Sequence, residues 1–277
     1  MIRAFAKSLL RPTLGKSGTQ TVYNAMYRLA LLGMNYSDAG LLSYSGEQRA
    51  FEHAIRLLTH RYGPDELVTV FDVGANVGNY SLMAAPRLAN SFPAGQIHAF
   101  EPSVSTYDRL ASNVSGLETV HVHKLALGDQ PGMGTLYQVF EGSGYASLYD
   151  RERGSLSSYG LKTTITEEVQ LTTIDKFCLE NSISRIDFLK IDAEGYEFKI
   201  LKGAQSMLES GAIAAIQFEF SEGCLDSRIF FKDFFDLLGR DYKLSRILRN
   251  GLYPLPRYSS RLEIFATSNF LAERIHN

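Results

Sequence analysis

The sequence predicts an α/β fold: a doubly wound, mostly parallel sheet of seven strands, covered by helices and ending in an antiparallel hairpin. Three observations support this fold. Strand and helix patterns alternate along the body of the chain, and two strands, IDFLKI and AAIQFEF, are almost continuously apolar. No convincing helical pattern separates the last two strands, which indicates that they pair antiparallel.

The elements follow one another in a simple order. Two lead-in segments, 20–34 and 46–62, have apolar side chains at helical spacing, and Gly63-Pro64 ends the second. We expect these two helices to cover one edge of the body. In the body, strands are expected at 67–73, 96–101, 119–125, 186–192, 213–220, 242–248 and 262–267, and helices at 78–89, 103–114, 196–210 and 227–238.

A long insertion separates the third and fourth body strands. It contains two further strand patterns, GTLYQVF and EEVQLTTI, around the Gly-, Ser- and Tyr-rich stretch EGSGYASLYDRERGSLSSYG. Long loops of this kind are usually lids, binding loops or disordered segments. We therefore expect a helical lead-in over 1–66 and one body over 67–277, with a lid-like insertion at about 128–170.

Composition restricts the class of protein. The chain has 277 residues, 45% of them hydrophobic, and a formal charge of −2, which gives no reason to expect a nucleic-acid partner. Cys178 and Cys224 lack the paired spacing of a zinc site, and no apolar run reaches the ~18–20 residues of a membrane span. A soluble cytoplasmic protein is expected, and a homo-oligomer remains open.

The N-terminal segment is basic and has no acidic residue before Asp38. This pattern is compatible with a membrane-surface helix or a transit peptide, although a solvated helix is the preferred interpretation. The basic residues are Arg3, Lys7, Arg11, Lys16 and Arg28.

The stretch VFDVGANVGNY (70–80) reads as a buried strand followed by a tight turn. In doubly wound sheets the first such turn is the usual ligand site. Gly74 allows the backbone to approach a ligand closely, Gly78 allows the helix to start against the strand, and Asn76 tolerates a left-handed conformation. A plain structural turn is the alternative at this point.

The ligand expected at this turn carries an amine and a nucleoside but no pyrophosphate. The stretch lacks the third glycine of a dinucleotide site, and Asp72 would attract an ammonium and repel a phosphate. Glu101 ends the second strand, 23 residues after Gly78, where an acid can accept hydrogen bonds from both ribose hydroxyls. S-adenosylmethionine fits this description.

With these residues in place, the sequence resembles the FkbM-type methyltransferases of the class I S-adenosylmethionine-dependent, Rossmann-like fold. The matching stretches, which cover roughly residues 67–222, are VFDVGANVGNYS, AFEPS, KLALGD, LTTIDKF, IDFLKIDAEGYEFKILKGAQSML and IQFEFSE. The resemblance implies a methyl-donor site and O-methylation of a hydroxyl on a sugar, a glycan or a polyketide-like small molecule. The lead-in and the tail LYPLPRYSSRLEIFATSNF carry no matching motif, so the acceptor stays open.

Four carboxylates should gather at the carboxyl edge of the sheet. Asp192 and Glu194 follow the fourth strand, and Glu219 and Glu222 belong to the end of the fifth. The resemblance places Asp192 and Glu194 in the family signature; we expect Asp192 beside the sulfonium, with Glu194 or Glu219 as the base near the acceptor. Glu197 is expected only to cap the following helix.

Two other ways to activate the acceptor are less favoured. Clustered carboxylates could hold Mg²⁺, but no spacing demands it and no metal is assigned. Among the six histidines, His53 could supply a base if the lead-in helix covers the active site.

The remaining candidates follow from the turn and the resemblance. Ala126 and Leu127 should contact the adenine, and Ser147 resembles a small residue of the family close to the donor. Tyr145, Tyr149, Arg151 and Arg153 could stack on a sugar or hold an anionic glycan. The expected cofactor-binding residues are Asp72, Gly74, Asn76, Gly78, Glu101, Pro102, Ala126, Leu127, Ser147 and Asp192, and the acceptor-binding residues are Tyr145, Tyr149, Arg151 and Glu222.

Two other functions remain as alternatives. An NAD-dependent oxidoreductase is opposed by the missing third glycine and by the C-terminal hairpin. A catalytically silent donor-binding protein would keep the fold without turnover.

Overall fold

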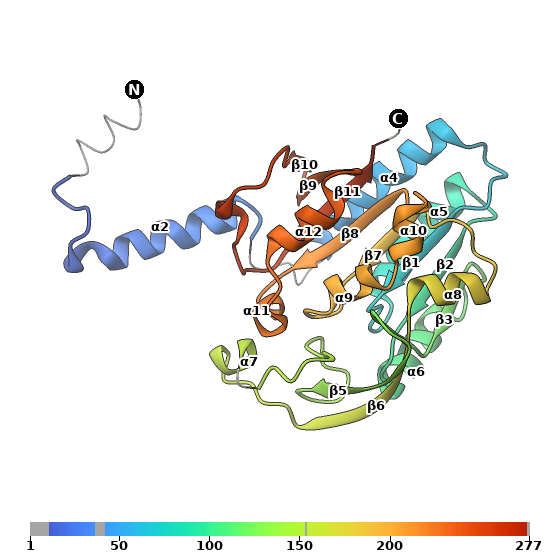
Figure 1. Ribbon diagram of the computed structural model, residues 1–277, viewed down its shortest axis with the longest axis horizontal. Helices are drawn as coiled ribbons and strands as arrows, with labels where there is room; N and C mark the ends of the chain where they lie inside the picture. Colours follow the sequence, from blue (N-terminus) through green and yellow to red (C-terminus); the bar gives the residue numbers. More distant parts are fainter. Residues whose placement is uncertain (1–10, 37–41, 153, 276–277) are drawn as a thin grey trace.

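The structure, a computed structural model, describes residues 11–36, 42–152 and 154–275. Its main element is an eight-stranded sheet with the order β10-β9-β11-β8-β7-β1-β2-β3 (Figure 1). The strands are β1 (Thr69–Val73), β2 (Gln96–Phe100), β3 (Val120–His123), β7 (Phe188–Ile191), β8 (Ala215–Phe220), β9 (Tyr242–Leu248), β10 (Gly251–Pro254) and β11 (Ser268–Arg274). The five strands from β8 to β3 run parallel, which confirms the α/β fold class.

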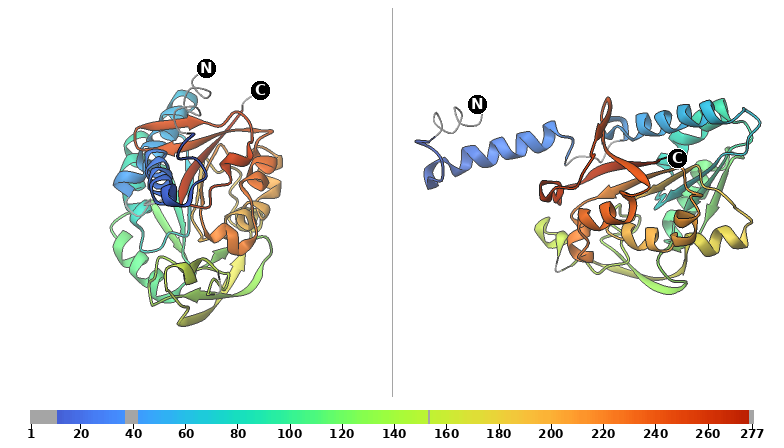
Figure 2. Two further views of the ribbon diagram at one scale, coloured as in Figure 1. Left: turned by 90° about the vertical axis from the view of Figure 1, so that its left-hand side faces the viewer. Right: turned by 45° about the horizontal axis from the view of Figure 1, so that its top comes forward.

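Helices cover both faces of this sheet (Figures 1 and 2). Those of the lead-in are η1 (Ser17–Thr19), α2 (Gln20–Gly33), α3 (Leu42–Ser45) and α4 (Glu47–Arg61). The body contains α5 (Asn79–Ser91), α6 (Val104–Val114), α8 (Ile174–Glu180), α9 (Glu197–Lys202), α10 (Gln205–Glu209), α11 (Gly223–Ser227), α12 (Phe231–Leu238) and η2 (Ser260–Leu262). In the described part of the chain, no helix combines the length and apolar character needed to cross a membrane.

Each central strand contributes to two cores, because alternate side chains of a strand point to opposite faces of the sheet. Val70 of β1 and Phe188 of β7 pack with α4 and α5. Their neighbours Phe71 and Leu189 pack in the other core, with α8 and α12. This double burial explains why the central strands read as continuous apolar runs.

The two lead-in helices differ from each other in burial. Both lead-in helices were expected to cover one edge of the body. Helix α4 instead covers a face of the sheet through Phe51, Ile55 and Leu58. Helix α2 covers neither an edge nor a face: it buries none of its residues and extends away from the body (Figure 1).

The C-terminal end of the sheet also corrects the prediction. The last strand is β11, at 268–274 and not at 262–267, and it lies between β8 and β9, antiparallel to both. The hairpin at the end of the sheet is β9–β10, which adds an eighth strand. The stretch 262–267 is apolar for another reason: Phe265 packs its ring 5.2 Å from that of Phe220.

Two expected helices are shorter than predicted. The helix expected at 196–210 is interrupted between α9 and α10 at Gly203, where a Cβ would lie 1.9 Å from the carbonyl oxygen of Gly128. The helix expected at 227–238 begins at Phe231, after the separate short α11. Close backbone contacts of this kind leave no periodic pattern in the sequence.

The insertion forms a second, smaller sheet below the main one in Figure 1. Its order is β4-β6-β5, from β4 (Ala126–Leu127), β5 (Gly132–Gln138) and β6 (Ile165–Thr172). The two strands expected here are present as β5 and β6, and they pair antiparallel. Helix α7 (Ser155–Ser158) lies between these strands in sequence. Whether the insertion acts as a lid stays a prediction.

Candidate functional site

The turn after β1 is held against the end of β7. Gly74 has a φ of +74°, and a Cβ there would lie 1.8 Å from the carbonyl oxygen of Asp192. Gly78 starts α5 with a φ of +90°, where a Cβ would approach Leu110 to 2.7 Å. Asn76 has a φ of +50°, as its tolerance of the left-handed region predicted. Only a chain with glycine at position 74 can bring these two strand ends so close.

Glu101, directly after β2, is fixed by the same turn. The backbone N–H of Asn76 donates to its Oε2 and the backbone N–H of Ser103 donates to its Oε1, both at 3.0 Å. The side chain is 6% exposed, and this burial raises the pKa of Glu101 to about 7. A carboxylate oriented in this way keeps lone pairs free to accept hydrogen bonds from two neighbouring hydroxyls.

A cavity lies over this turn, and we call it the turn cavity. Eight of the ten expected cofactor residues line it: Gly74, Asn76, Glu101, Pro102, Ala126, Leu127, Ser147 and Asp192. The apolar side chains of Phe100, Leu136 and Leu148 complete its wall. Ser147 and Leu148 come from the insertion, which therefore forms one side of the cavity. The turn cavity thus combines an apolar wall with a fixed carboxylate, as a nucleoside site requires.

Asp72 and Gly78 do not line the turn cavity. Asp72 is fully buried, accepts a hydrogen bond from Ser81 Oγ at 2.8 Å, and lies 3.1 Å from Lys190 Nζ. The expectation that Asp72 meets a ligand ammonium directly is therefore corrected: its charge is already paired with Lys190. Gly78 serves the packing of α5 against Leu110.

A second cavity, which we call the edge cavity, adjoins the first at the carboxyl edge of the sheet. Gly74, Asn76, Asp192 and Glu194 line both cavities. The expected residues Glu219, Glu222, Tyr145 and Arg151 line the edge cavity, together with Glu47, Tyr80, Tyr159, Lys190 and Asn269. The structure therefore brings most of the expected donor and acceptor residues to two adjoining cavities.

Tyr149 lies outside both cavities. Its ring packs 5.2 Å from that of Tyr196, and Lys199 Nζ lies 5.9 Å from the ring centre. Burial raises the pKa of the Tyr149 hydroxyl to about 12. The expected acceptor contact of Tyr149 is replaced by packing of the insertion on α9.

Arg151 ties the insertion to the body. Its Nη1 donates to Glu194 Oε2 at 2.6 Å, its Nε donates to Ser155 Oγ at 3.0 Å, and Asp226 Oδ2 lies 3.4 Å from Nε. The side chain is 4% exposed. Because the guanidinium is already paired with two carboxylates, it is not available to hold an anionic glycan as expected. Arg153 lies outside the described residues.

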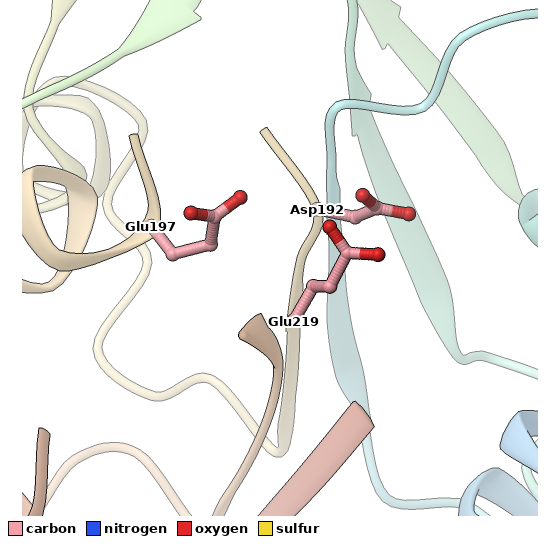
Figure 3. Close-up of side chains that lie close together, drawn as sticks. All are labelled: Asp192, Glu197 and Glu219. Carbon is pink, nitrogen blue, oxygen red and sulfur yellow. The ribbon is translucent and has the colours of Figure 1, made fainter. Parts of the chain in front are cut away.

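Three carboxylates, those of Asp192, Glu197 and Glu219, lie close together, as Figure 3 shows, and Asp192 and Glu219 line the edge cavity. One oxygen each of Asp192, Glu197 and Glu219 lies within 4.8 Å of the others. Glu197 Oε1 accepts hydrogen bonds from the backbone N–H groups of Ala193 and Gly195, which supports its expected structural role. Lys190 Nζ, 3.5 Å from Asp192 Oδ2, already supplies a positive charge beside the cluster.

Crowding of like charges changes the acidity of this cluster. Burial, followed by the charge of Asp192, raises the pKa of Glu219 well above its usual range. Burial also raises the pKa of Glu197 to about 7. A carboxylate with a raised pKa, such as that of Glu219, is a better proton acceptor than an ordinary carboxylate, which suits a group that takes up a proton during a reaction.

The histidines of the described residues line neither the turn cavity nor the edge cavity. His53, in the middle of α4, places its Nε2 2.8 Å from Glu273 Oε1. His98 Nδ1 and His123 Nε2 are 3.0 Å apart, and burial lowers the pKa of each to about 4. None of these three lines the turn or edge cavity.

Sequence reasoning missed Lys190 and Glu47. Lys190 is buried in β7, and the charges of Asp72 and Asp192 raise its pKa. A lysine inside the otherwise apolar strand FLKI was a signal that could have found it. Glu47, at the start of α4, accepts hydrogen bonds from Ser45 Oγ and Gln217 Nε2, both at 2.7 Å. Its contacts connect residues far apart in sequence, so no local pattern marks it.

Replacing Glu47 by Gln should change how stability depends on pH. Burial raises the folded pKa of Glu47 from 4.5 to about 7, so the folded state holds this proton more tightly than the unfolded state. The stabilisation is present below pH 4.5 and is lost as the pH rises through 7. Titration of Glu47 should therefore lower the unfolding free energy of the unchanged protein by about 3 kcal/mol between pH 5 and 8, and Glu47→Gln should not show this decrease.

Urea unfolding at several pH values between 5 and 8 measures this difference. Glu118→Gln, at an exposed position beside β3, is the matched control and should leave the pH dependence unchanged. An unchanged pH dependence in Glu47→Gln would show that Glu47 titrates normally in the folded protein.

Comparison with known proteins gives a family match. The family model described as the methyltransferase FkbM domain matches residues 72–243, more than half of the chain. Hexuronic acid methyltransferase AglP of Haloferax volcanii is 28% identical over 58% of this chain and 59% of its own length. Methyltransferase sdnD of Sordaria araneosa is 29% identical over 48% of this chain and 59% of its own length. The chain thus spans about three fifths of the length of these curated relatives.

Solved structures that match part of this chain include a crystal structure of methyltransferase FkbM from Methylobacillus flagellatus. It has a TM-score of 0.40 and 15% identity, over 74% of this chain and 43% of that chain. A METTL16 methyltransferase domain has a TM-score of 0.43 and 12% identity, over 82% of this chain and 67% of that chain.

Proposed function

This chain belongs to the FkbM methyltransferase family, and we propose on that premise that it transfers a methyl group from S-adenosylmethionine to a hydroxyl of a sugar, a glycan or a related small molecule. The observation that carries the proposal is the position of Glu101. Two backbone N–H groups fix its carboxylate in the wall of the turn cavity, opposite the apolar side chains of that cavity. The family match favours this activity over an NAD-dependent oxidoreductase.

The turn cavity has the residues that the donor needs. Glu101 would accept hydrogen bonds from the two ribose hydroxyls, and Ala126 and Leu127 would contact the adenine. Gly74 and Asp192 line the junction with the edge cavity, where the amino-acid part and the sulfonium would lie. When bound, S-adenosylmethionine supplies an activated methyl group on a sulfonium.

The edge cavity has the residues that a hydroxylated acceptor needs. Methyl transfer from a sulfonium requires an aligned oxygen and a group that takes up its proton. Glu219 is the base that we propose, because its carboxyl lies in this cavity and has a raised pKa. Glu194 is a weaker choice for the base, since its carboxylate is paired with Arg151.

The charges of the edge cavity favour a neutral acceptor. Five carboxylates line it, from Glu47, Asp192, Glu194, Glu219 and Glu222. The two cations that line it, Lys190 and Arg151, are both paired with carboxylates. An anionic acceptor would find no unpaired positive charge among these residues, whereas the exposed rings of Tyr145 and Tyr159 offer a stacking surface to a neutral sugar. The similarity to a hexuronic acid methyltransferase therefore supports a carbohydrate acceptor, while the charges of the edge cavity favour a neutral sugar over a uronate.

Methyl transfer itself tests this proposal. The protein is incubated with isotopically labelled S-adenosylmethionine and a panel of neutral monosaccharides, the corresponding uronates and small phenols. We expect label in a neutral sugar, at an oxygen, with one equivalent of S-adenosylhomocysteine released. Label on carbon or nitrogen would contradict O-methylation. Tight donor binding without turnover on any acceptor would favour the silent donor-binding alternative.

A further inference from the structure

Helix α2 is exposed along most of its length, and Leu31, near its C-terminal end, packs partly against the core. The helix leaves the body as a free-standing rod, which both Figure 1 and the right-hand view of Figure 2 show. Five large hydrophobic side chains of this helix are more than half exposed: Leu29 (70%), Val22 (60%), Tyr27 (58%), Met26 (55%) and Leu32 (51%). A helix of 14 residues is marginal in water without a partner, and a continuous exposed apolar surface usually marks an interaction site.

Three of the exposed apolar residues share one face of α2, whereas Tyr27 lies on the other side. Val22, Met26 and Leu29 follow one another at spacings of four and three, which places them on one side of a helix. Gln20, Asn24 and Arg28 recur at spacings of four and form a polar stripe on the other side. The apolar face of Val22, Met26 and Leu29 is not covered by the described part of the body, since all three side chains are exposed.

Asn35 and Tyr36, which lie just after the end of α2 and which we call its root, are attached to the sheet by hydrogen bonds. Asn35 Nδ2 donates to the carbonyl oxygens of Ser45 (2.9 Å) and Ile247 (3.0 Å), and Ser268 Oγ donates to the Asn35 carbonyl at 3.1 Å. Tyr36 is fully buried, and its hydroxyl accepts a hydrogen bond from Arg246 at 2.9 Å. The helix is therefore presented by fixed contacts at its C-terminal end.

The charge of the N-terminal segment that contains α2 distinguishes between two possible partners of the apolar face of this helix. The described residues of the segment include Arg11, Lys16 and Arg28, and the sequence has no acidic residue before Asp38. Pairing of α2 with a second copy would bring like charges together. A membrane surface with anionic lipids would instead accept the apolar face and attract the basic residues.

We propose that α2 docks on an anionic membrane surface, with Val22, Met26 and Leu29 in the acyl–headgroup boundary and the basic residues at the lipid headgroups. Thr267 and Asn269, the neighbours of Ser268, line the edge cavity. The root of the docking helix thus lies beside the cavity proposed for the acceptor. The docking proposal does not depend on the chemistry that the site performs.

Vesicle flotation of the full chain tests the proposal. Vesicles of phosphatidylcholine alone are compared with vesicles that also contain phosphatidylserine. We expect the protein to float with the anionic vesicles, and the bound fraction to fall as salt screens the headgroups. Leu29→Ser should lower the binding constant about tenfold, because it removes the most exposed apolar side chain from the boundary.

Leu179→Ser is the matched control, since Leu179 is 82% exposed on α8 and carries no part of this face. It should float like the unchanged protein, and circular dichroism should show that both variants keep their fold. Equal flotation of Leu29→Ser would overturn the proposal, as would absence of flotation with anionic vesicles. A dimer in sedimentation that Leu29→Ser dissociates, without vesicle binding, would assign the face to a second copy instead.

Discussion

Replacing Glu219 by Gln is expected to lower the rate constant of methyl transfer by about 100-fold to 10,000-fold, the range that a general base contributes. Glu219 lines the edge cavity and not the turn cavity. Its carboxyl is 8% exposed, and burial together with the charge of Asp192 raises its pKa. Gln keeps the shape of the side chain but cannot take up a proton, so donor affinity should change little.

Turnover at saturating donor, measured against pH, separates the roles of the carboxylates. In the unchanged protein the rate should rise with pH as Glu219 loses its proton, and Glu219→Gln should remove this rise. Glu209→Gln, on the exposed side of α10, is the control and should retain full activity. Activity of Glu219→Gln within about threefold of normal would transfer the role of base to another group, with Glu194 the first to examine.

Replacing Gly74 by Ala should destabilise the fold by about 3 kcal/mol or more, from left-handed strain and overpacking together. The backbone at position 74 has a φ of +74°, and the added Cβ would lie 1.8 Å from the Asp192 carbonyl oxygen. Neither the turn nor the end of β7 can move freely, because both belong to neighbouring parallel strands. The strand ends would separate, and the junction of the two cavities would be lost with them.

Urea unfolding of Gly74→Ala and of Gly116→Ala measures this effect. A Cβ at Gly116 would meet nothing within 4 Å, so this substitution should change the unfolding free energy by less than about 1 kcal/mol. Equal stability of the two variants would contradict the close approach of β1 and β7. If Gly74→Ala does not fold at all, the prediction holds in its stronger form.

Elements with a local signature could be predicted from the sequence. The strands β1, β2, β7 and β8 were found because buried parallel strands are apolar on both faces. The last strand was misplaced by six residues, because Phe265 and its neighbours are apolar through ring packing and not through strand pairing. A short strand such as β10 has too few residues to show a period.

In the candidate site, too, residues with a local sequence pattern could be predicted, whereas contacts between distant segments could not. Glu101 and the glycine turn were identified because their spacing reflects a strand–turn–helix unit. The partner of Asp72 is Lys190, on a strand far away in sequence, and a single sequence does not display such a pair. The expected contact of Asp72 with a ligand was wrong for this reason. Arg151 was likewise assigned to a ligand because its partners, Glu194 and Asp226, come from distant segments.

The central claim is that the turn cavity binds S-adenosylmethionine through Glu101, and calorimetric titration tests it most directly. S-adenosylmethionine, S-adenosylhomocysteine and NAD are titrated into the unchanged protein, into Glu101→Gln and into the control Glu118→Gln. We predict that the first two ligands bind and NAD does not, and that Glu101→Gln weakens binding about 10-fold to 100-fold while the control leaves it unchanged. Binding of NAD alone, or donor binding that is unaffected in Glu101→Gln, would contradict the assignment of the site.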